Sequence, residues 1–516
     1  MIVRISQLLS LWLFAGCLFA EPSVQADDQQ PERPNIILIL VDDMGWSDLG
    51  CYGSEVATPH LDRLAQEGLR FRQFYNTGKC FPSRACLLTG RYAQEVDMWN
   101  THGRMANHTT FGAALQQAGY YTVAVGKHHG DESLFDEGFD RYYGLKDGAS
   151  NHFNPGGTLE EGFAQKNRVR SYVFDDREEA PWVPENSDFY TTDAYTSWAI
   201  ELLRQRPAAE ENFLLFLSYT APHDPLQAWP EDIAKYAGVY DVGYRAIRES
   251  RWEKQQSLGV VTEDYRLSAA HYADWSSLTD EERDREIRRM QVYAAMIDSL
   301  DQNIGRLLSW LREESLLENT VILFMSDNGG SGEDAEHGFG EIGSASMWGS
   351  LRENWANVAN TPLRFFKNFS HEGGIRTPMI AWWPGHIAPG TFTDYEGHFI
   401  DILPTLLDIS GAVYPETHHG RPVPPASGES LLPVLEGMGL EQREGPLFFQ
   451  WSKGGALIED GWKLVRGRSG GSWELYHLAE DPVETRDLAA RHPARLQAMA
   501  DEWTAWFTET TGAASP

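Results

Sequence analysis

Short, almost wholly apolar runs recur along this chain, and longer polar stretches with helical spacing separate them. A run that is apolar at successive positions buries both faces of a strand, which is typical of parallel sheets covered by helices. We interpret five such runs as buried parallel strands: Asn35–Val41, Tyr121–Val125, Phe213–Leu217, Thr320–Met325 and Met379–Trp382.

Helical patterns lie between these runs, with Thr58 placed to cap the first of them. They are Pro59–Leu69, Phe111–Ala118, a long helix near Asp284–Glu314, and Ile402–Ile409. The alternation predicts an α/β fold with a large, mostly parallel sheet sandwiched by helices.

The remaining stretches divide the chain further. Residues 225–283 are polar, rich in aromatic residues and weakly periodic, and we interpret them as an insertion over the active face. A linker-like stretch, Thr417–Ser427, carries Pro and Gly. Beyond it we predict a small C-terminal α+β subdomain with three short antiparallel strands and a closing helix: Leu447–Gln450, Trp462–Arg466, Trp473–His477 and Pro493–Phe507. The predicted domains are therefore a large one at residues 27–425 and a small one at 426–516.

Residues 1–26 have the pattern of an export signal, with an apolar run and small residues at Val24-Gln25-Ala26 for cleavage. We expect an exported protein, periplasmic or secreted. Lipid anchoring at Cys17 is the less favoured alternative, because Phe14 matches a lipoprotein signal poorly. No later apolar run is long enough to span a bilayer.

The 516 residues carry a formal net charge of −32, which argues against nucleic acid as a partner. An acidic surface repels polyanions at long range, so any anion site must be a local positive pocket. The four cysteines form no disulfide framework for an exported chain of this size. Whether Cys51 and Cys86 pair is left open.

Ionisable clusters follow four of the predicted strands. They are Asp42-Asp43, Lys127-His128-His129, His223-Asp224 and Asp327-Asn328. Ligands of open α/β sheets bind outside the carboxyl ends of the strands, so these endings predict one convergent site.

Hard oxygen donors dominate two of these clusters: Asp42, Asp43, Asp327 and Asn328. Such donors suit Ca²⁺ or Mg²⁺ far better than zinc, and of the two we favour Ca²⁺. Either pair alone could be a simple turn former. Two pairs meeting beside a reactive cysteine make a metal the better interpretation.

The run Cys80–Arg91 predicts a helix that begins just after Cys80, with Pro82 in its first turn and Gly90 at its end. A group at Cys80 would lie over the positive end of that helix, which favours an oxyanion. Arg84, about one turn further on, can direct its guanidinium at the same place. The alternative is a buried structural cysteine.

This run resembles the signature of the type I sulfatases, Cys-x-Pro-Ser-Arg-x-x-x-Leu-Thr-Gly-Arg, at every fixed position. The resemblance extends from about Pro34 to Trp506 and is to the bacterial arylsulfatase-like branch of the alkaline phosphatase superfamily. It implies an alkaline-phosphatase-like fold. It also implies that a formylglycine-generating enzyme oxidises Cys80 to formylglycine during maturation.

The resemblance further implies a Ca²⁺ ion bound by Asp42, Asp43, Asp327, Asn328 and the modified Cys80. Lys127 and His129 fall in the family's Gly-Lys-Trp-His motif, with His128 where Trp is usual, so the choice between the two histidines stays open. His223 falls in Pro-His-x-Pro. Lys367 precedes His371–Arg376, which resembles the family's Glu-Gly-Gly-Ile-Arg segment.

Together these features predict hydrolysis of a sulfate monoester, aryl or carbohydrate, from a small molecule or a glycan. Arg84 would orient the nucleophile, Lys127 and Lys367 would hold sulfate, His223 would assist the leaving alcohol, and His129 would take a proton to release sulfate from a covalent sulfo-enzyme. Three alternatives remain: a phosphodiester or phosphonate monoester hydrolase, an inactive glycan-binding relative, and an unmodified Cys80.

Overall fold

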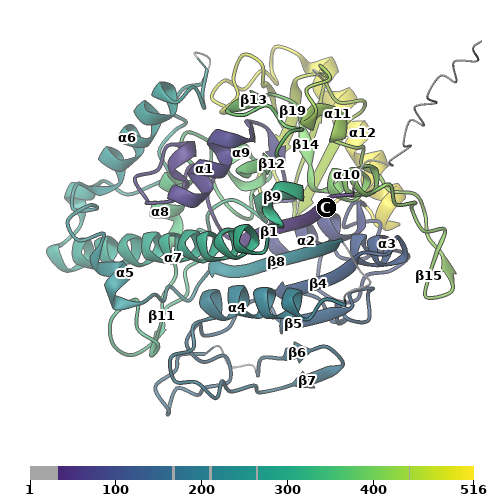
Figure 1. Cartoon of the computed structure of the whole chain (residues 1–516). Coiled ribbons are helices and arrows are strands. Elements are labelled where there is room, and N and C mark those ends of the chain that lie inside the picture. Colours follow the sequence, from purple (N-terminus) through teal and green to yellow (C-terminus); the bar gives the residue numbers. More distant parts are fainter. Residues whose placement is uncertain (1–32, 166–168, 208–211, 263–264, 441) are drawn as a thin grey trace, which may run out of the picture. The chain divides into compact units, whose positions relative to one another are not determined.

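The computed structural model describes residues 33–165, 169–207, 212–262, 265–440 and 442–516. The predicted export signal and Cys17 lie outside this part of the chain. Its centre is a ten-stranded sheet (Figure 1). From edge to edge the strands are β13 (Thr391–Thr393), β2 (Leu69–Phe71), β12 (Met379–Trp382), β9 (Thr320–Ser326), β1 (Asn35–Asp42), β8 (Phe213–Pro222), β4 (Tyr121–Gly126), β5 (Arg141–Leu145), β6 (Tyr172–Phe174) and β7 (Arg177–Glu179).

The central strands β9, β1, β8, β4 and β5 are parallel, which confirms the predicted α/β sheet. The prediction that Met379–Trp382 is also parallel is wrong, because β12 pairs antiparallel with β9 and β2. The chain leaves β9 at its carboxyl end, and Met379 at the start of β12 pairs with Met325 at that same end. No crossover intervenes, so β12 runs back along β9.

Alternate residues of β1 enter two different cores. Ile37, Ile39 and Val41 pack in one core, and Ile36 and Leu38 pack in the other. The first core is covered by α1 (Pro59–Glu67), α4 (Thr191–Arg204) and α7 (Asp280–Glu313), and the second by α2 (Cys80–Thr89), α3 (Phe111–Gln117) and α10 (Ile402–Ser410).

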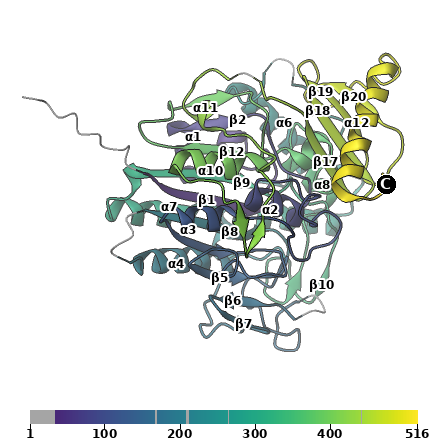
Figure 2. The same cartoon turned by 90° about the vertical axis from the view of Figure 1, so that its right-hand side faces the viewer.

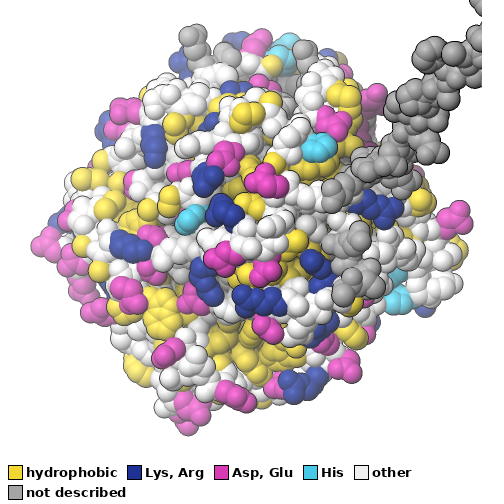
Figure 3. Space-filling view, in the orientation of Figure 1, with side chains coloured by type: hydrophobic (Ala, Val, Ile, Leu, Met, Phe, Trp, Pro, Cys, Tyr) yellow, Lys and Arg dark blue, Asp and Glu magenta, His cyan; other side chains and the backbone are white. Residues whose placement is uncertain are grey.

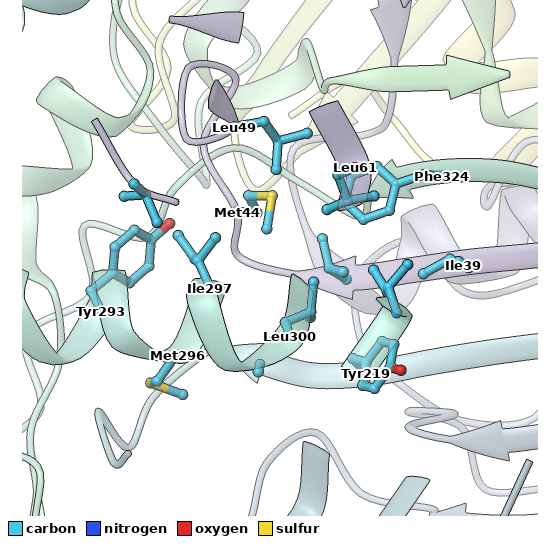
Figure 4. Close-up of a cluster of buried hydrophobic side chains, with 14 of the residues drawn as sticks. Ile39, Met44, Leu49, Leu61, Tyr219, Tyr293, Met296, Ile297, Leu300 and Phe324 are labelled. Atoms are coloured by element: carbon cyan, nitrogen blue, oxygen red, sulfur yellow. The ribbon is translucent and has the colours of Figure 1, made fainter. Parts of the chain in front are cut away.

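Figure 4 shows part of the first core, where side chains from α7 lie against β1, β8 and β9. Tyr293, Ile297 and Leu300 project from one side of α7, as the helical period requires. Ile39 and Phe324 come from the neighbouring strands β1 and β9. Helices on both faces thus hold the carboxyl ends of the parallel strands in fixed register.

The long helix α7 begins at Asp280, earlier than predicted, because Thr279 and Glu282 form a reciprocal capping box. The predicted insertion at 225–283 is more regular than expected. It contains α5 (Pro230–Ala234), α6 (Gly243–Ser257) and the 3₁₀ helix η2 (Trp275–Ser277). Arg248 and Arg251 lie on the buried face of α6, which hides its hydrophobic periodicity.

A second sheet near the C-terminus is antiparallel and packs on the helix α12 (Pro493–Thr511) (Figure 2). Its strands are β17 (Leu447–Trp451), β18 (Gly454–Glu459), β19 (Trp462–Arg466) and β20 (Glu474–His477). The sequence predicted three of these strands and missed β18, which begins with two glycines. The α+β character of this region is confirmed, whereas the boundary at residue 425 stays a prediction.

Short elements complete the described chain. They are η1 (Gly50–Tyr52), β3 (Phe74–Tyr75), η3 (Leu317–Asn319), β10 (His337–Gly338), β11 (Met347–Trp348), α8 (Arg352–Ala359), α9 (Glu372–Ile375), β14 (Gly397–His398), η4 (Phe399–Asp401), β15 (Thr417–His418), β16 (Arg421–Pro422) and α11 (Leu432–Leu435). Among the described helices, none combines the length and apolarity needed to cross a membrane. Acidic and basic side chains are interspersed on the face in Figure 3.

Candidate active site

The carboxyl ends of four adjacent parallel strands bring the predicted residues together. Asp42 ends β1, and its strand partner on β8 is Pro222, one residue before His223. Asp327 follows β9, and its backbone N–H donates to Val41 O on β1 at 3.0 Å. The N–H of Asp43 donates to Asp327 Oδ1 at 3.4 Å. The two acidic pairs therefore meet at one point, as the sequence predicted.

Arg84 fastens helix α2 to these strand ends. Its Nε donates to Asp327 Oδ2 at 2.8 Å, and its Nη1 donates to Ser218 Oγ at 2.6 Å and to Lys127 O at 2.8 Å. Its Nη2 lies 4.0 Å from Asp42 Oδ2. Burial opposes the charge of Arg84, but Asp327 and Asp42 outweigh it and raise the guanidinium pKa.

Two buried lysines contact the first acidic pair. Lys127 Nζ donates to Asp42, and Lys367 Nζ lies 2.7 Å from Asp43 Oδ1. Burial opposes ionisation of Lys367, yet Asp43 and Glu333 raise its pKa well above the usual value. Burial alone would raise the pKa of Asp42, but the charge of Lys127 lowers it. The pKa of Asp42 is therefore below its usual value. Lys367 is thus held charged beside the acidic pair.

Helix α2 begins at Cys80, one residue earlier than predicted. Cys80 is 2% exposed. It lines a cavity of about 230 Å³ together with Lys79, Phe81, His102, His129, Gly148, Ala149, Arg170, His223 and Glu333. The first turn of α2 points its free N–H groups toward this end, so the thiol lies in a field that favours negative charge.

The structure separates the two adjacent histidines. His129 lines the cavity, whereas the ring of His128 is directed at Glu132, with Nε2 and Oε1 3.5 Å apart. His129 has φ of 70°, a left-handed conformation that is uncommon outside glycine. Burial and the charges of Lys127 and Arg84 hold the pKa of His129 well below its ordinary value, so its imidazole is neutral near pH 7.

His223 has the opposite electrostatic environment. Its Nδ1 lies 2.7 Å from Asp224 O and its Nε2 lies 3.6 Å from Asp43 Oδ2. Burial alone would lower the pKa of His223, but Asp43 and Asp42 raise it above the ordinary value. One histidine at the cavity is therefore poised to accept a proton and the other to donate one.

Two oxygens among these residues point to a cation. Asp42 Oδ1 and Asn328 Oδ1 are fully buried, and neither has a hydrogen-bond partner within the described part of the chain. An unpaired buried carboxylate oxygen is costly unless a cation balances it. Asn328 Nδ2 donates to Asp43 Oδ1 at 2.6 Å, so the amide oxygen of Asn328 is turned away from Asp43. This donor set fits a hard divalent ion, and Asp42, Asp43 and His223 also group closely enough to share one.

Sequence reasoning missed three groups at this site. Lys79 Nζ donates to Glu333 Oε1 at 2.8 Å, and the same oxygen lies 3.6 Å from Lys367 Nζ. The charge of Lys367 has the largest effect on the pKa of Glu333 and lowers it. Burial acts in the opposite direction, and Lys79 lowers the pKa further. Ser218 supports Arg84 from inside β8. Lys79 precedes Cys80 and Glu333 shortly follows Asp327, so only their proximity in sequence could have indicated them.

Comparison with known proteins agrees with this geometry. The family model described as Sulfatase matches residues 34–412. A second model, described as N-sulphoglucosamine sulphohydrolase, C-terminal, matches residues 363–502. The chain therefore belongs to the sulfatase family, enzymes that hydrolyse sulfate esters, within the alkaline phosphatase superfamily that its fold defines.

Individual relatives cover most of the chain. An uncharacterized sulfatase of Schizosaccharomyces pombe is 30% identical over 94% of this chain and 96% of its own length. The arylsulfatase of Klebsiella aerogenes is 31% identical over 78% of this chain and 92% of its own. A solved structure, described as Ps i-CgsB in complex with k-i-k-neocarrahexaose, has a TM-score of 0.68 and 25% identity, covering 94% of this chain and 95% of that one.

Proposed function

We propose that this sulfatase hydrolyses a carbohydrate or aryl sulfate monoester in the cavity over Cys80, with Cys80 oxidised to formylglycine and a Ca²⁺ ion beside it. The observation that carries the proposal is the joint lining of one cavity by Cys80, His129 and His223 above buried acids and lysines. A small anionic group fits a cavity of this size. The family assignment supplies the reaction class.

Asp42, Asp43, Asp327 and Asn328 would hold the ion, and the modified side chain at position 80 would complete its ligands. When present, the ion supplies positive charge at the sulfate oxygens, and formylglycine supplies a hydrated aldehyde with a hydroxyl for attack on sulfur. Arg84 orients that position from the next turn of α2, because its guanidinium is fixed by Asp327 and Ser218.

The charges of the site support binding of a sulfate ester. Four acids, Asp42, Asp43, Asp327 and Glu333, face four bases, Lys79, Arg84, Lys127 and Lys367. The protein groups are thus close to balanced, and a divalent ion makes the site positive. Lys127 and Lys367 would then neutralise sulfate oxygens. This local positive site would work despite the net charge of −32.

Proton transfers can be divided between the two histidines. His223 lies at the cavity with a raised pKa, so it donates a proton to the oxygen of the leaving alcohol. His129, whose pKa is depressed, accepts the proton whose removal allows sulfate to be released. The two pKa directions are those that an acid and a base in one site require.

A sugar substrate has support beside the cavity. A second hollow of about 750 Å³ shares Arg170 with it and gives room for an extended alcohol. Trp451 stacks edge-on against Phe81, with ring centroids 5.4 Å apart. The relative bound to neocarrahexaose is consistent with a carbohydrate. We propose that the protein is exported and meets such a substrate outside the cytoplasm after a formylglycine-generating enzyme has modified Cys80.

Mass spectrometry of the Cys80 peptide from protein made in its native host tests the modification. We expect the aldehyde or its hydrate, and an intact thiol in fully active protein would overturn that part.

A paired assay on 4-nitrophenyl sulfate and on an aryl phosphodiester or phosphonate monoester tests the reaction class. We expect kcat/KM to favour the sulfate by at least about 100-fold, equivalent to about 2.7 kcal/mol in transition-state binding. Preference for a phosphorus ester would contradict the proposal.

A further inference from the structure

A second group of metal-binding side chains lies outside the Cys80 cavity. His108 precedes α3, Glu137 lies between β4 and β5, and His418 and His419 belong to the hairpin of β15 and β16. This hairpin projects from the fold near α3 (Figure 1). None of these four residues lines the cavity over Cys80. The sequence analysis placed the hairpin in a linker-like stretch and gave these residues no role.

Three imidazoles converge on one carboxylate oxygen, Glu137 Oε2. His108 Nε2 and His418 Nε2 each lie 3.0 Å from Glu137 Oε2, and His419 Nε2 lies 3.6 Å from the same oxygen. The two ring nitrogens of His108 and His418 and the carboxylate oxygen are all within 4.8 Å of one another. In a tetrahedral zinc site with bonds of about 2.0–2.1 Å, ligand atoms are about 3.3 Å apart. The three spacings to Glu137 Oε2 bracket that value. His419 falls outside the group whose ligand atoms are all within 4.8 Å of one another, so its exposed ring must turn to complete four ligands.

The backbone presents these side chains from a rigid base. Thr110 caps α3 and donates through its hydroxyl to Glu137 O at 2.6 Å. Gly138, at φ of 91°, packs so closely on Ala113 that a β-carbon there would lie 2.5 Å from the Ala113 side chain. The loop that carries Glu137 is therefore locked against the helix that follows His108. Only the hairpin must be fixed to complete the group.

The hairpin has an unusual geometry at its turn. His419 and Gly420 both have positive φ, 49° and 72°, as a two-residue type I′ turn requires. Successive side chains of a strand normally point to opposite faces. The left-handed turn brings His419 back to the same side as His418, so both imidazoles reach Glu137.

Burial and donor type identify the class of ligand. The side chains of His108 and Glu137 are each 7% exposed and that of His418 is 9%, whereas His419 is 57% exposed and leaves a path from solvent. Imidazole nitrogens with one carboxylate suit Zn²⁺ and neighbouring transition metals, and do not suit Ca²⁺. Each histidine must then turn a lone pair, in place of an N–H, toward the centre.

We propose that His108, Glu137 and His418 form the base of a structural zinc site that fastens the β15–β16 hairpin to the loops around α3, and that His419 turns its exposed ring in as the fourth ligand. Four protein ligands close a tetrahedral site, so it leaves no position for catalysis. Binding joins residues about 300 positions apart in sequence through one ion, which stabilises the folded chain by mass action. The site is independent of the proposed reaction at Cys80.

The test uses the full mature protein, stripped of metal, saturated with Ca²⁺ and titrated with ZnCl₂ by calorimetry. We expect one Zn²⁺ per chain with a Kd below about 1 µM, weakened at least about tenfold in His418→Gln and in His108→Gln. His386→Gln, at an exposed histidine elsewhere, is the matched control and should bind like the wild type. Co²⁺ substitution should give the visible absorption of a four-coordinate site in the wild type.

Zinc is also expected to raise the apparent Tm of the wild type by several degrees. It should leave the apparent Tm of His418→Gln and of His108→Gln unchanged. His419→Gln alters only a solvent-exposed ligand, so it keeps the test valid if the buried variants fold poorly, and it should weaken Zn²⁺ binding several-fold. Wild-type protein that binds no Zn²⁺ at micromolar concentration overturns the site. The site is also overturned if folded His419→Gln and His418→Gln bind Zn²⁺ as tightly as the wild type.

Discussion

Arg84 and Asp327 form a buried ion pair in which two guanidinium nitrogens, Nε and Nη2, each lie 2.8 Å from the same carboxylate oxygen. The pair joins the helix that begins with Cys80 to the end of β9. Because Arg84 also donates to Ser218 and to the carbonyl of Lys127, one side chain relates α2 to β4, β8 and β9. The position of α2 against these strand ends depends on this contact.

Arg84→Lys is therefore not a conservative change. Lysine keeps the charge but replaces a planar set of donors with one ammonium, which cannot reach Asp327, Ser218 and the Lys127 carbonyl together. We expect kcat for 4-nitrophenyl sulfate to fall by at least about 100-fold, with a smaller change in KM. Arg91→Lys, just beyond the same helix, should remain within about threefold of the wild type. Similar kinetics for the two variants would contradict this role.

Cys80→Ser tests the need for two hydroxyls on one carbon. A serine can attack sulfur once but cannot expel sulfate by forming an aldehyde, so we expect at most one slow turnover per chain. Rapid-quench measurement of released alcohol checks this, together with mass spectrometry for a trapped sulfate. Cys86→Ser, in the same helix but buried in the core, should keep multiple turnovers. Sustained turnover by Cys80→Ser would rule out the formylglycine mechanism.

Removal of divalent ions tests the oxygen ligands. Asp42 Oδ1 and Asn328 Oδ1 are buried without hydrogen-bond partners in the described chain, so a site emptied of metal leaves two buried acceptor oxygens unsatisfied. We expect chelation to reduce kcat at least about 100-fold and Ca²⁺, but not Zn²⁺, to restore it. Asp42→Asn should lose the response to Ca²⁺. Full activity in protein shown to be metal-free by elemental analysis would be incompatible with a catalytic ion.

A buried charge network connects the C-terminal sheet to the loop after Lys367. Lys463 on β19 lies 2.7 Å from Glu372 Oε1 and 2.8 Å from Glu484 Oε1, and all three side chains are inaccessible to solvent. Lys463→Met leaves these carboxylates without their shared cation, and we expect it to destabilise the protein by about 3–5 kcal/mol. Urea denaturation measures the loss. Lys453→Met, at an exposed turn, should unfold like the wild type. Equal urea midpoints for Lys463→Met and the wild type would show that the network contributes little.

Asp301 makes stability depend on pH. It accepts from the N–H groups of His60 and Leu61 at the start of α1, while burial raises its pKa to about 7. The folded state then binds this proton more tightly than the unfolded state does. The free energy of unfolding should therefore fall as pH rises from about 4 to 7, by at most about 4 kcal/mol.

Asp301→Asn removes the titrating group and keeps one acceptor for Leu61, so its apparent Tm should vary less between pH 5 and pH 8 than that of the wild type. Asp408→Asn, at an exposed site on α10, is the matched control. Thermal unfolding at several pH values measures the difference. Parallel pH profiles for the wild type and Asp301→Asn would show that another group controls this dependence.

The parts of the fold that local pattern determines were predictable. Buried strands such as Asn35–Asp42 are apolar on both faces, and the polar residues that end them mark the site because parallel strands share one edge. The direction of Met379–Trp382 was not predictable, since it depends on where the preceding chain travels. Helix α6 was obscured because Arg251 occupies its buried face and is neutralised by Asp48 and Glu55, residues far away in sequence.

The site residues divide in the same way. Arg84 and the acids of β1 and β9 belong to patterns with characteristic spacing, and the structure places them in contact. Lys79 and Glu333 have no such pattern, and their pairing appears only when two loops meet. The ambiguity between His128 and His129 could not be resolved by spacing, because backbone conformation decides which ring enters the cavity.

Helix α2 is made early in the chain, whereas its partner Asp327 is made more than two hundred residues later. At ordinary rates of synthesis this gap lasts on the order of ten seconds or longer. During that interval no β9 exists to draw Arg84 inward, and the thiol that is 2% exposed in the finished protein is open on the growing chain. The order of translation would thus give the proposed modifying enzyme access that folding later closes.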